Sequence, residues 1–227
     1  MTYHKLFKFI IVGDKYVGKT SILNKWLDPF RDIRLYQNTI GVEFGSKIYS
    51  INRGVKTDNT LNMEKRNIKV HYWDTAGQEE FFAIIKSYFR NIAGIIVVFD
   101  LNDRKSFDNI NMWCNQIDIN NNCAHDHVHP ILILGNKSDK GTSISKEEID
   151  KKVNELDAIY YEVSAITNKN LDKAIHALIN KVYDNTILLN LKNSSCSGIK
   201  NGVIEYVKRY KKRDNSCYID NQCCSIM

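Results

Sequence analysis

The chain has 227 residues and a formal net charge of +6, with six cysteines and two prolines. This length predicts one domain of roughly 180 residues that buries its own core, followed by a tail. No apolar run approaches the ~20 residues of a membrane-spanning helix, and we expect neither a signal peptide nor, with Thr2 at the second position, N-myristoylation. The scattered cysteines favour free thiols in a reducing cytosol over a disulfide framework.

The excess positive charge belongs to the C-terminal part of the chain. From residue 186 onward there are seven lysines and arginines against three acidic residues, so +4 of the net charge lies there. A basic tail on a nearly neutral domain indicates an anionic membrane surface, and we expect no nucleic-acid partner.

Strand-like and helix-like segments alternate along the chain. The expected strands are residues 6–12, 43–51, 67–73, 95–99 and 131–134. The expected helices are residues 19–27, 81–90, 106–119, 146–156 and 171–188. The pattern predicts an α/β fold, with an open, mostly parallel sheet flanked by helices on both faces and ligands at the carboxyl ends of its strands.

Two polar segments interrupt this alternation. Residues 52–66 are too long for a tight turn and predict an extended, exposed hairpin loop. Beyond Leu191, a run of serine, asparagine and glycine cannot continue a helix or bury a core. We therefore predict a domain over residues 1–190 and a flexible tail over residues 191–227.

A glycine-rich loop separates the first strand from the first helix. Gly13, Gly18, Lys19 and Thr20 match the pattern G-x-x-x-x-G-K-[ST], which is typical of a P-loop when a strand precedes it and a helix follows. Backbone amides of residues 15–20 can bind phosphate oxygens, Lys19 can neutralise the β- and γ-phosphates, and Thr20 can ligate Mg²⁺. A plain glycine-punctuated turn is the alternative for this motif taken alone.

Three further motifs complete a nucleotide site. Asp74 follows a strand where an acid reaches the magnesium shell, Gly77 allows close approach to the γ-phosphate, and Gln78 can orient the attacking water. Asn136 and Asp139 also follow a strand, and a carboxylate there can accept the N1–H and N2–H₂ donors of guanine. These residues are joined by Lys137 along the base plane, Ser164 and Ala165 closing over the base, and Thr39 as a further Mg²⁺ ligand.

The chain resembles the Rab family of Ras-like small GTPases over about residues 5–188 and at the C-terminus. The resemblance is carried by residues 39–44, 73–79, 87–90 and 136–139 and by the terminal double cysteine. It implies a small G-protein fold that binds GTP or GDP with Mg²⁺, and an aromatic triad of Phe44, Trp73 and Tyr88 that effectors read. The nucleotide-binding residues expected are Gly13, Asp14, Lys15, Tyr16, Val17, Gly18, Lys19, Thr20, Ser21, Thr39, Gly77, Asn136, Lys137, Asp139, Ser164, Ala165 and Ile166.

Several positions depart from the family pattern. Lys15 and Tyr16 replace small residues of the P-loop, and Lys15 is expected close to the γ-phosphate. Ile166 stands where the family commonly has lysine, and Phe30 is the nearest candidate for stacking on guanine. Glu80 and Phe82 replace arginines usual in the second switch. His125, His127 and His129 suggest a metal cluster, but a solvated loop is favoured because no second ligand pair follows.

The last residues predict lipid attachment. Cys224-Ser225-Ile226-Met227 fits the C-a-a-X pattern and Cys223 offers a second acceptor, with farnesyl favoured by the terminal methionine and geranylgeranyl by the Rab resemblance. Two lipid chains, or one chain plus the basic residues 208–213, bind a membrane stably.

The expected function is a GTP-hydrolysing membrane switch that recruits effectors in vesicle trafficking. The resemblance implies a monomer that works on the cytoplasmic face of a vesicle, Golgi or endosome membrane and cycles with the cytosol. It implies effectors, an exchange factor, a GAP, a prenyl escort protein and a GDI-type protein as partners. A slow or non-hydrolysing GTP-binding scaffold is the alternative, whereas Asn136 and Asp139 disfavour an adenine-specific P-loop kinase.

Overall fold

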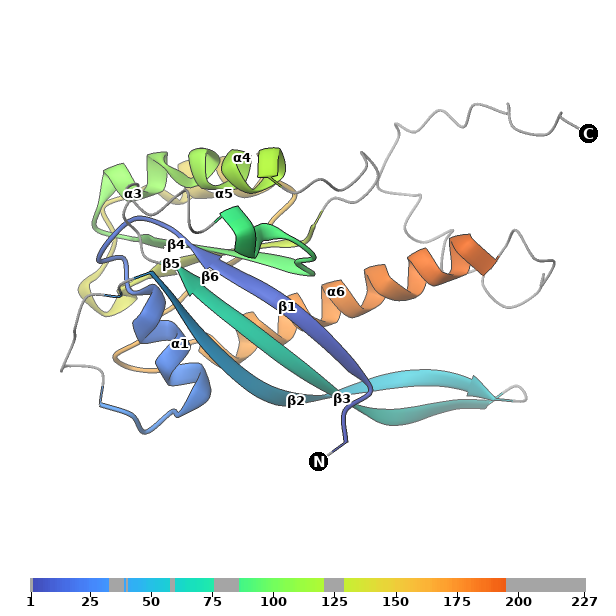
Figure 1. Cartoon of the computed structure of the whole chain (residues 1–227). Helices are drawn as coiled ribbons and strands as arrows, with labels where there is room; N and C mark the ends of the chain where they lie inside the picture. Colours follow the sequence, from blue (N-terminus) through green and yellow to red (C-terminus); the bar gives the residue numbers. More distant parts are fainter. Residues whose placement is uncertain are drawn as a thin grey trace, which may run out of the picture. The chain divides into compact units, whose positions relative to one another are not determined.

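The computed structural model describes residues 2–32, 39, 41–57, 60–75, 86–120 and 129–194 (Figure 1). Within them, six strands form one sheet in the order β2-β3-β1-β4-β5-β6, in which only the β2–β3 pair is antiparallel. The strands are β1 (Lys5–Val12), β2 (Val42–Thr57), β3 (Thr60–Thr75), β4 (Gly94–Asp100), β5 (Ile131–Asn136) and β6 (Ile159–Glu162). The predicted open, mostly parallel sheet is confirmed.

Helices cover both faces of this sheet. The helices are α1 (Lys19–Leu27), α3 (Arg104–Asp108), α4 (Ile110–Asn120), α5 (Lys146–Glu155) and α6 (Leu171–Ser194), with short 3₁₀ turns η2 (Lys86–Phe89) and η3 (Ser138–Lys140). Because side chains alternate along β1, Phe9 and Ile11 pack in one core with α1 and α6, whereas Ile10 and Val12 pack in a second core with α3, α4 and α5. Figure 1 shows the two helix layers on opposite sides of β1.

Residues 52–66, predicted as an extended hairpin loop, do lie in a hairpin, but its arms are paired strands rather than loop. β2 and β3 stay in register from Val42↔Thr75 to Thr57↔Thr60, and residues 58–59 lie outside the described part. Polar composition signals exposure to water, but it leaves each backbone free to pair with the neighbouring strand. Arg53 links the ribbon formed by β2 and β3 to α6, because its Nη2 donates to the backbone and side-chain oxygens of Asn180.

Three other elements also differ from the sequence prediction. The single helix expected over residues 106–119 is two helices, α3 and α4, joined at Asn109. Strand β6 was not predicted, because its four residues are too short for a clear pattern. The helix expected over residues 81–90 falls partly outside the described residues, and its described end is the 3₁₀ turn η2.

The chain divides into two compact units, Met1–Tyr183 and Asp184–Met227. The first contains the sheet, and of the second the structure describes only the end of α6, through Ser194. Among the described residues, no helix is both long and apolar enough to cross a bilayer.

Candidate functional site

The loop between β1 and α1 has a conformation that requires its two glycines. Gly13 and Gly18 have φ angles of +141° and +97°. A Cβ on Gly13 would lie 2.1 Å from the carbonyl oxygen of Val98, and one on Gly18 would lie 2.3 Å from Nδ2 of Asn136. Substitution at either position therefore meets both backbone strain and a collision. Tyr16 also has a positive φ of 64°, which is unusual for a bulky residue.

The Lys19 side chain folds back over this loop. Its Nζ donates to the carbonyl oxygens of Gly13 at 2.9 Å and Asp14 at 2.8 Å, and the residue is buried. Burial lowers the pKa of Lys19 from 10.5 to about 8, while the Asp74 and Asp14 carboxylates act in the opposite direction. A buried ammonium at the start of a helix is suited to binding an anion.

Three oxygen-bearing side chains from separate segments meet beside Lys19. The Thr20 hydroxyl lies 2.6 Å from the Thr39 hydroxyl and donates to Oδ2 of Asp74 at 2.5 Å. Oδ1 of Asp74 is buried and has no hydrogen-bond partner among the residues that the structure describes. Burial raises the pKa of Asp74 to about 7, although its Thr20 hydrogen bond and Lys19 act to lower it. Hydroxyl and carboxylate oxygens with an unsatisfied buried acceptor fit a Mg²⁺ ion.

Asn136 ties the loop of β1 to the segment after β6. Its Nδ2 donates to the carbonyl oxygen of Val17 at 2.8 Å, and its Oδ1 accepts from the backbone N–H of Ala165 at 3.2 Å. The side chain is buried. Asn136 therefore joins two predicted nucleotide-binding segments to each other.

The two residues that follow complete this edge of the sheet. The ammonium of Lys137 pairs with Oδ2 of Asp100, at the end of β4, over 2.7 Å. Oδ1 of Asp139 accepts a hydrogen bond from the Ser164 hydroxyl at 2.5 Å, and Oγ of Ser164 in turn accepts the N–H of Thr167 at 3.2 Å. Ala165 is buried, whereas Ile166 is 59 % exposed.

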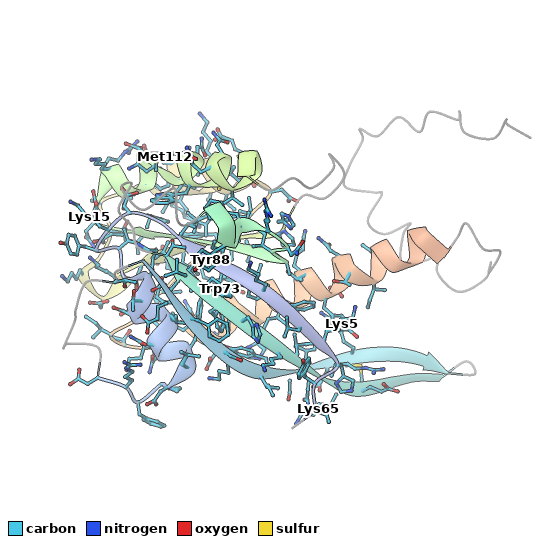
Figure 2. The ribbon with its side chains drawn as sticks, in the orientation of Figure 1. Lys5, Lys15, Lys65, Trp73, Tyr88 and Met112 are labelled. Carbon is cyan, nitrogen blue, oxygen red and sulfur yellow. The ribbon has the colours of Figure 1, made fainter. Side chains whose placement is uncertain are left out.

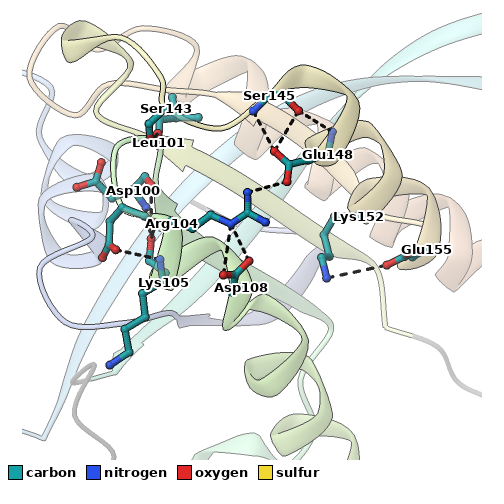
Figure 3. Close-up of polar contacts among 12 residues, drawn as sticks. Asp100, Leu101, Arg104, Lys105, Asp108, Ser143, Ser145, Glu148, Lys152 and Glu155 are labelled. Carbon is teal, nitrogen blue, oxygen red and sulfur yellow. Dashed lines mark hydrogen bonds and ion pairs between the residues drawn. The ribbon is translucent and has the colours of Figure 1, made fainter.

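Polar contacts hold the segment after β4 in place (Figure 3). Ser106 donates to the carbonyl oxygen of Asp103 and accepts the N–H of Asp100. Arg104 on α3 pairs with Asp108 and, at 2.6 Å, with Glu148 on α5. These contacts fix the end of β4, from which Asp100 reaches Lys137.

The three predicted effector-binding aromatics form one cluster across β2, β3 and η2. The ring centroids of Phe44 and Trp73 are 5.1 Å apart, and those of Trp73 and Tyr88 are 4.9 Å apart. Phe44 is 50 % exposed and also meets the ring of His71 edge-on at 5.0 Å. Figure 2 shows Trp73 beside Tyr88.

The phosphate loop contains one acidic side chain, that of Asp14, and its partners lie far along the chain. The Asp14 carboxylate accepts 2.7 Å hydrogen bonds from Nδ2 of Asn109 and Nε1 of Trp113, at and beyond the α3–α4 junction. The sequence analysis did not single out Asn109, Trp113 or Asp100. No local motif signals them, because they lie far along the chain from the residues they contact.

Three other predicted site residues, Phe30, Lys15 and Ser21, take no part in the contacts described above. Phe30 is 96 % exposed. The Lys15 ammonium lies 5.9 Å from the centroid of the exposed Tyr16 ring (Figure 2 labels Lys15). Ser21 lies in the first turn of α1.

The predicted residues that lie outside the described part are Gly77, Gln78, Glu80, Phe82, His125, His127, the basic residues 208–213, Cys223 and Cys224. Among the described residues there is no cluster of three or more metal-ligating His, Cys, Asp or Glu side chains.

Comparison with known proteins agrees with this geometry. The sequence of residues 8–184 matches the sequence-family model of the Ras family. The chain is 34 % identical to Ras-related protein Rab-13 of Bos taurus over 85 % of this chain and 88 % of that protein. It is 35 % identical to Ras-related protein Rab-10 of Caenorhabditis elegans (81 % and 86 %) and 36 % identical to GTP-binding protein YPTM2 of Zea mays (80 % and 82 %). The chain therefore belongs to the Ras family as a Rab-type small GTPase, an enzyme that binds GTP or GDP with Mg²⁺ and hydrolyses GTP.

Proposed function

We propose that this GTPase acts as a membrane-attached switch that recruits effectors in vesicle trafficking. The observation that carries the proposal is the contact of Thr20 with both Thr39 and Asp74. Thr39 belongs to the segment that leads into β2, so its ligation would link nucleotide state to the effector-facing strands.

The nucleotide would lie along the carboxyl ends of β1, β4 and β5. Lys19 would neutralise the β- and γ-phosphates, and Thr20, Thr39 and Asp74 would hold Mg²⁺, which when bound stabilises charge on the transferred phosphoryl group. Gln78 would orient the attacking water. The proposed nucleotide contacts are residues 13–21, Thr39, Gly77, Asn136, Lys137, Asp139, Ser164, Ala165 and Ile166.

Guanine would be selected by Asp139. Its carboxylate can accept the N1–H and N2–H₂ donors, which adenine lacks, and Ser164 orients that carboxylate through its hydrogen bond. Asn136 would act by holding the phosphate loop and the Ala165 segment at a fixed separation, since both ends of its amide are already bonded.

The switch would be read at the aromatic cluster of Phe44, Trp73 and Tyr88. Phe44 is half exposed and contacts Trp73 on β3, which contacts Tyr88 on η2, so a partner can sense both segments at once. Exposed aromatic side chains on a rigid sheet are typical anchors of protein interfaces.

The tail would attach the switch to an endomembrane. Prenylation of Cys223 and Cys224, aided by the basic residues 208–213, would hold the protein on the cytoplasmic face of a vesicle, Golgi or endosome membrane. An escort protein, a GDI-type protein, an exchange factor and a GAP would then move a monomeric protein between membrane and cytosol.

Localisation of the tagged full chain in its own cells tests this proposal. The parent protein and Gln78→Leu are expected on one organelle, and Thr20→Asn, which loses a Mg²⁺ ligand, is expected to leave it. Adding Phe44→Ala to Gln78→Leu should keep GTP binding but prevent the recruitment of effectors to that organelle. A uniform cytosolic distribution of both parent and Gln78→Leu would contradict the switch.

A further inference from the structure

Asp14 is held by hydrogen bonds to both its backbone and its side chain. Its backbone oxygen accepts from Nζ of Lys19 at 2.8 Å, on the side of the proposed phosphate site. Its carboxylate has different partners: Oδ2 accepts from Nδ2 of Asn109 and Oδ1 from Nε1 of Trp113, both at 2.7 Å. We call Asp14, Asn109 and Trp113 the Asp14 clamp.

The two donors of the clamp are rigidly placed. Trp113 is 1 % exposed and belongs to the core that α4 forms with the sheet. Asn109 lies at the junction of α3 and α4, where its N–H donates to Lys105 and its carbonyl accepts from Trp113. The donors therefore cannot follow a movement of the loop without disturbing the helix packing.

The loop needs such support. Its glycines at positions 13 and 18 leave the backbone many unfolded conformations, and binding a ligand is stronger when the loop is already ordered. A carboxylate in a phosphate-binding loop would also repel phosphate if it turned inward. The clamp keeps this carboxylate hydrogen-bonded to Asn109 and Trp113, while the Asp14 carbonyl oxygen stays bonded to Lys19.

We propose that Asn109 and Trp113 are positioning residues for nucleotide binding, acting through Asp14. They preorganise the phosphate loop, so that losing either bond speeds release of GDP without removing any group that touches it. This inference rests on the proposed placement of the phosphates at residues 13–20. Lys19→Ala tests that placement separately, because it should abolish GDP binding whether or not the clamp matters.

The test measures release of a preloaded fluorescent GDP analogue from the purified full-length protein with Mg²⁺. Trp113→Phe keeps an aromatic side chain but loses the indole N–H, and we expect release about tenfold faster, the effect of one hydrogen bond to a charged group. Trp26→Phe is the matched control. Trp26 is equally buried, and its indole N–H donates to Leu171 at 3.0 Å, away from the loop. The control should change release by less than about twofold.

Variants of Asp14 separate geometry from charge. Asp14→Ala should release GDP at least about tenfold faster, and adding Trp113→Phe to it should have little further effect, because the bond is already absent. Asp14→Asn should stay within about threefold of the parent, since its oxygen can accept from Trp113 and its amide can donate to a rotated Asn109 amide.

The rates of GDP release from these variants test whether the clamp positions the loop. Equal release from Trp113→Phe, Trp26→Phe and the parent would overturn the clamp. Release from Asp14→Asn as fast as from Asp14→Ala would show that charge on Asp14, not its position, is what matters. Should Asp14→Ala fail to fold, Trp113→Phe and Asp14→Asn still give the answer. Normal GDP binding by Lys19→Ala would instead contradict the phosphate site itself.

Discussion

The Ser164 hydroxyl donates a 2.5 Å hydrogen bond to Oδ1 of Asp139, joining the segment after β6 to the segment after β5. The two residues are 25 positions apart, and Oγ of Ser164 also accepts the N–H of Thr167. The bond restrains one oxygen of the Asp139 carboxylate. In the proposed guanine site this carboxylate would be oriented before the base binds, which favours strict recognition of one base.

Asp139→Asn should move the base preference from guanine toward xanthine. An amide offers a donor where guanine also offers donors, whereas the 2-oxo group of xanthine can accept it. Competition binding of GTP and XTP to the purified variant measures the change. A variant that keeps parental GTP affinity and gains nothing for XTP would argue against Asp139 as the residue that reads guanine.

GDP affinity in the absence of Mg²⁺ should fall with pH above about 8. The pKa of Lys19 in the free protein is about 8, and phosphates stabilise its charged form, so binding requires the proton. This predicts about eightfold weaker binding at pH 9 than at pH 7.5. The unfolded chain keeps this proton up to about pH 10.5, so the free energy of unfolding of the nucleotide-free protein should rise between about pH 8 and 10.5.

Fluorescence titration with GDP in EDTA at several pH values measures this dependence. Lys19→Arg is the control, because a guanidinium stays charged throughout the range and its slope should vanish. An affinity of the parent protein that stays constant from pH 7.5 to 9 would refute a titrating Lys19.

Lys15→Ser should raise the rate of GTP hydrolysis. The long side chain in the phosphate loop can displace the attacking water or block an incoming arginine, and a misplacement of ~1 Å can cost about 10²-fold. Its charge acts the other way by stabilising the transition state. Single-turnover hydrolysis with and without a GAP measures the balance, with Gln78→Leu as the inactive control. Slower hydrolysis by Lys15→Ser would make Lys15 a catalytic cation instead.

Substituting both Cys223 and Cys224 with serine should leave the protein cytosolic. Neutralising the basic residues 208–213 should only weaken membrane attachment, by up to ~1 kcal/mol for each charge near an anionic leaflet. Fractionation of cells expressing each variant separates the two effects. If the double-cysteine variant still pellets with membranes, the tail does not carry a lipid anchor.

Local sequence determined the parts of this protein that depend on neighbouring residues. The glycines, Lys19 and Thr20 specify a loop and helix start, and α1 covers residues 19–27 as predicted. Apolar runs specify the central strands β4 and β5 because both their faces are covered. Strands alternating with helices imply parallel pairing, which brings Asp74 and Asn136 to the same edge of the sheet.

The tertiary structure alone decided which distant side chains meet. Asp14 contacts Asn109 and Trp113, which are 95 and 99 positions away, and Asn136 contacts Val17 across 119 positions. Such contacts depend on how helices pack on the sheet, and the spacing of residues along one segment carries no record of it. The pairing of β2 with β3 across residues 52–66 was also decided at this level. Strand pairing satisfies backbone N–H and C=O groups whatever the side chains are, so the polar sequence did not predict it.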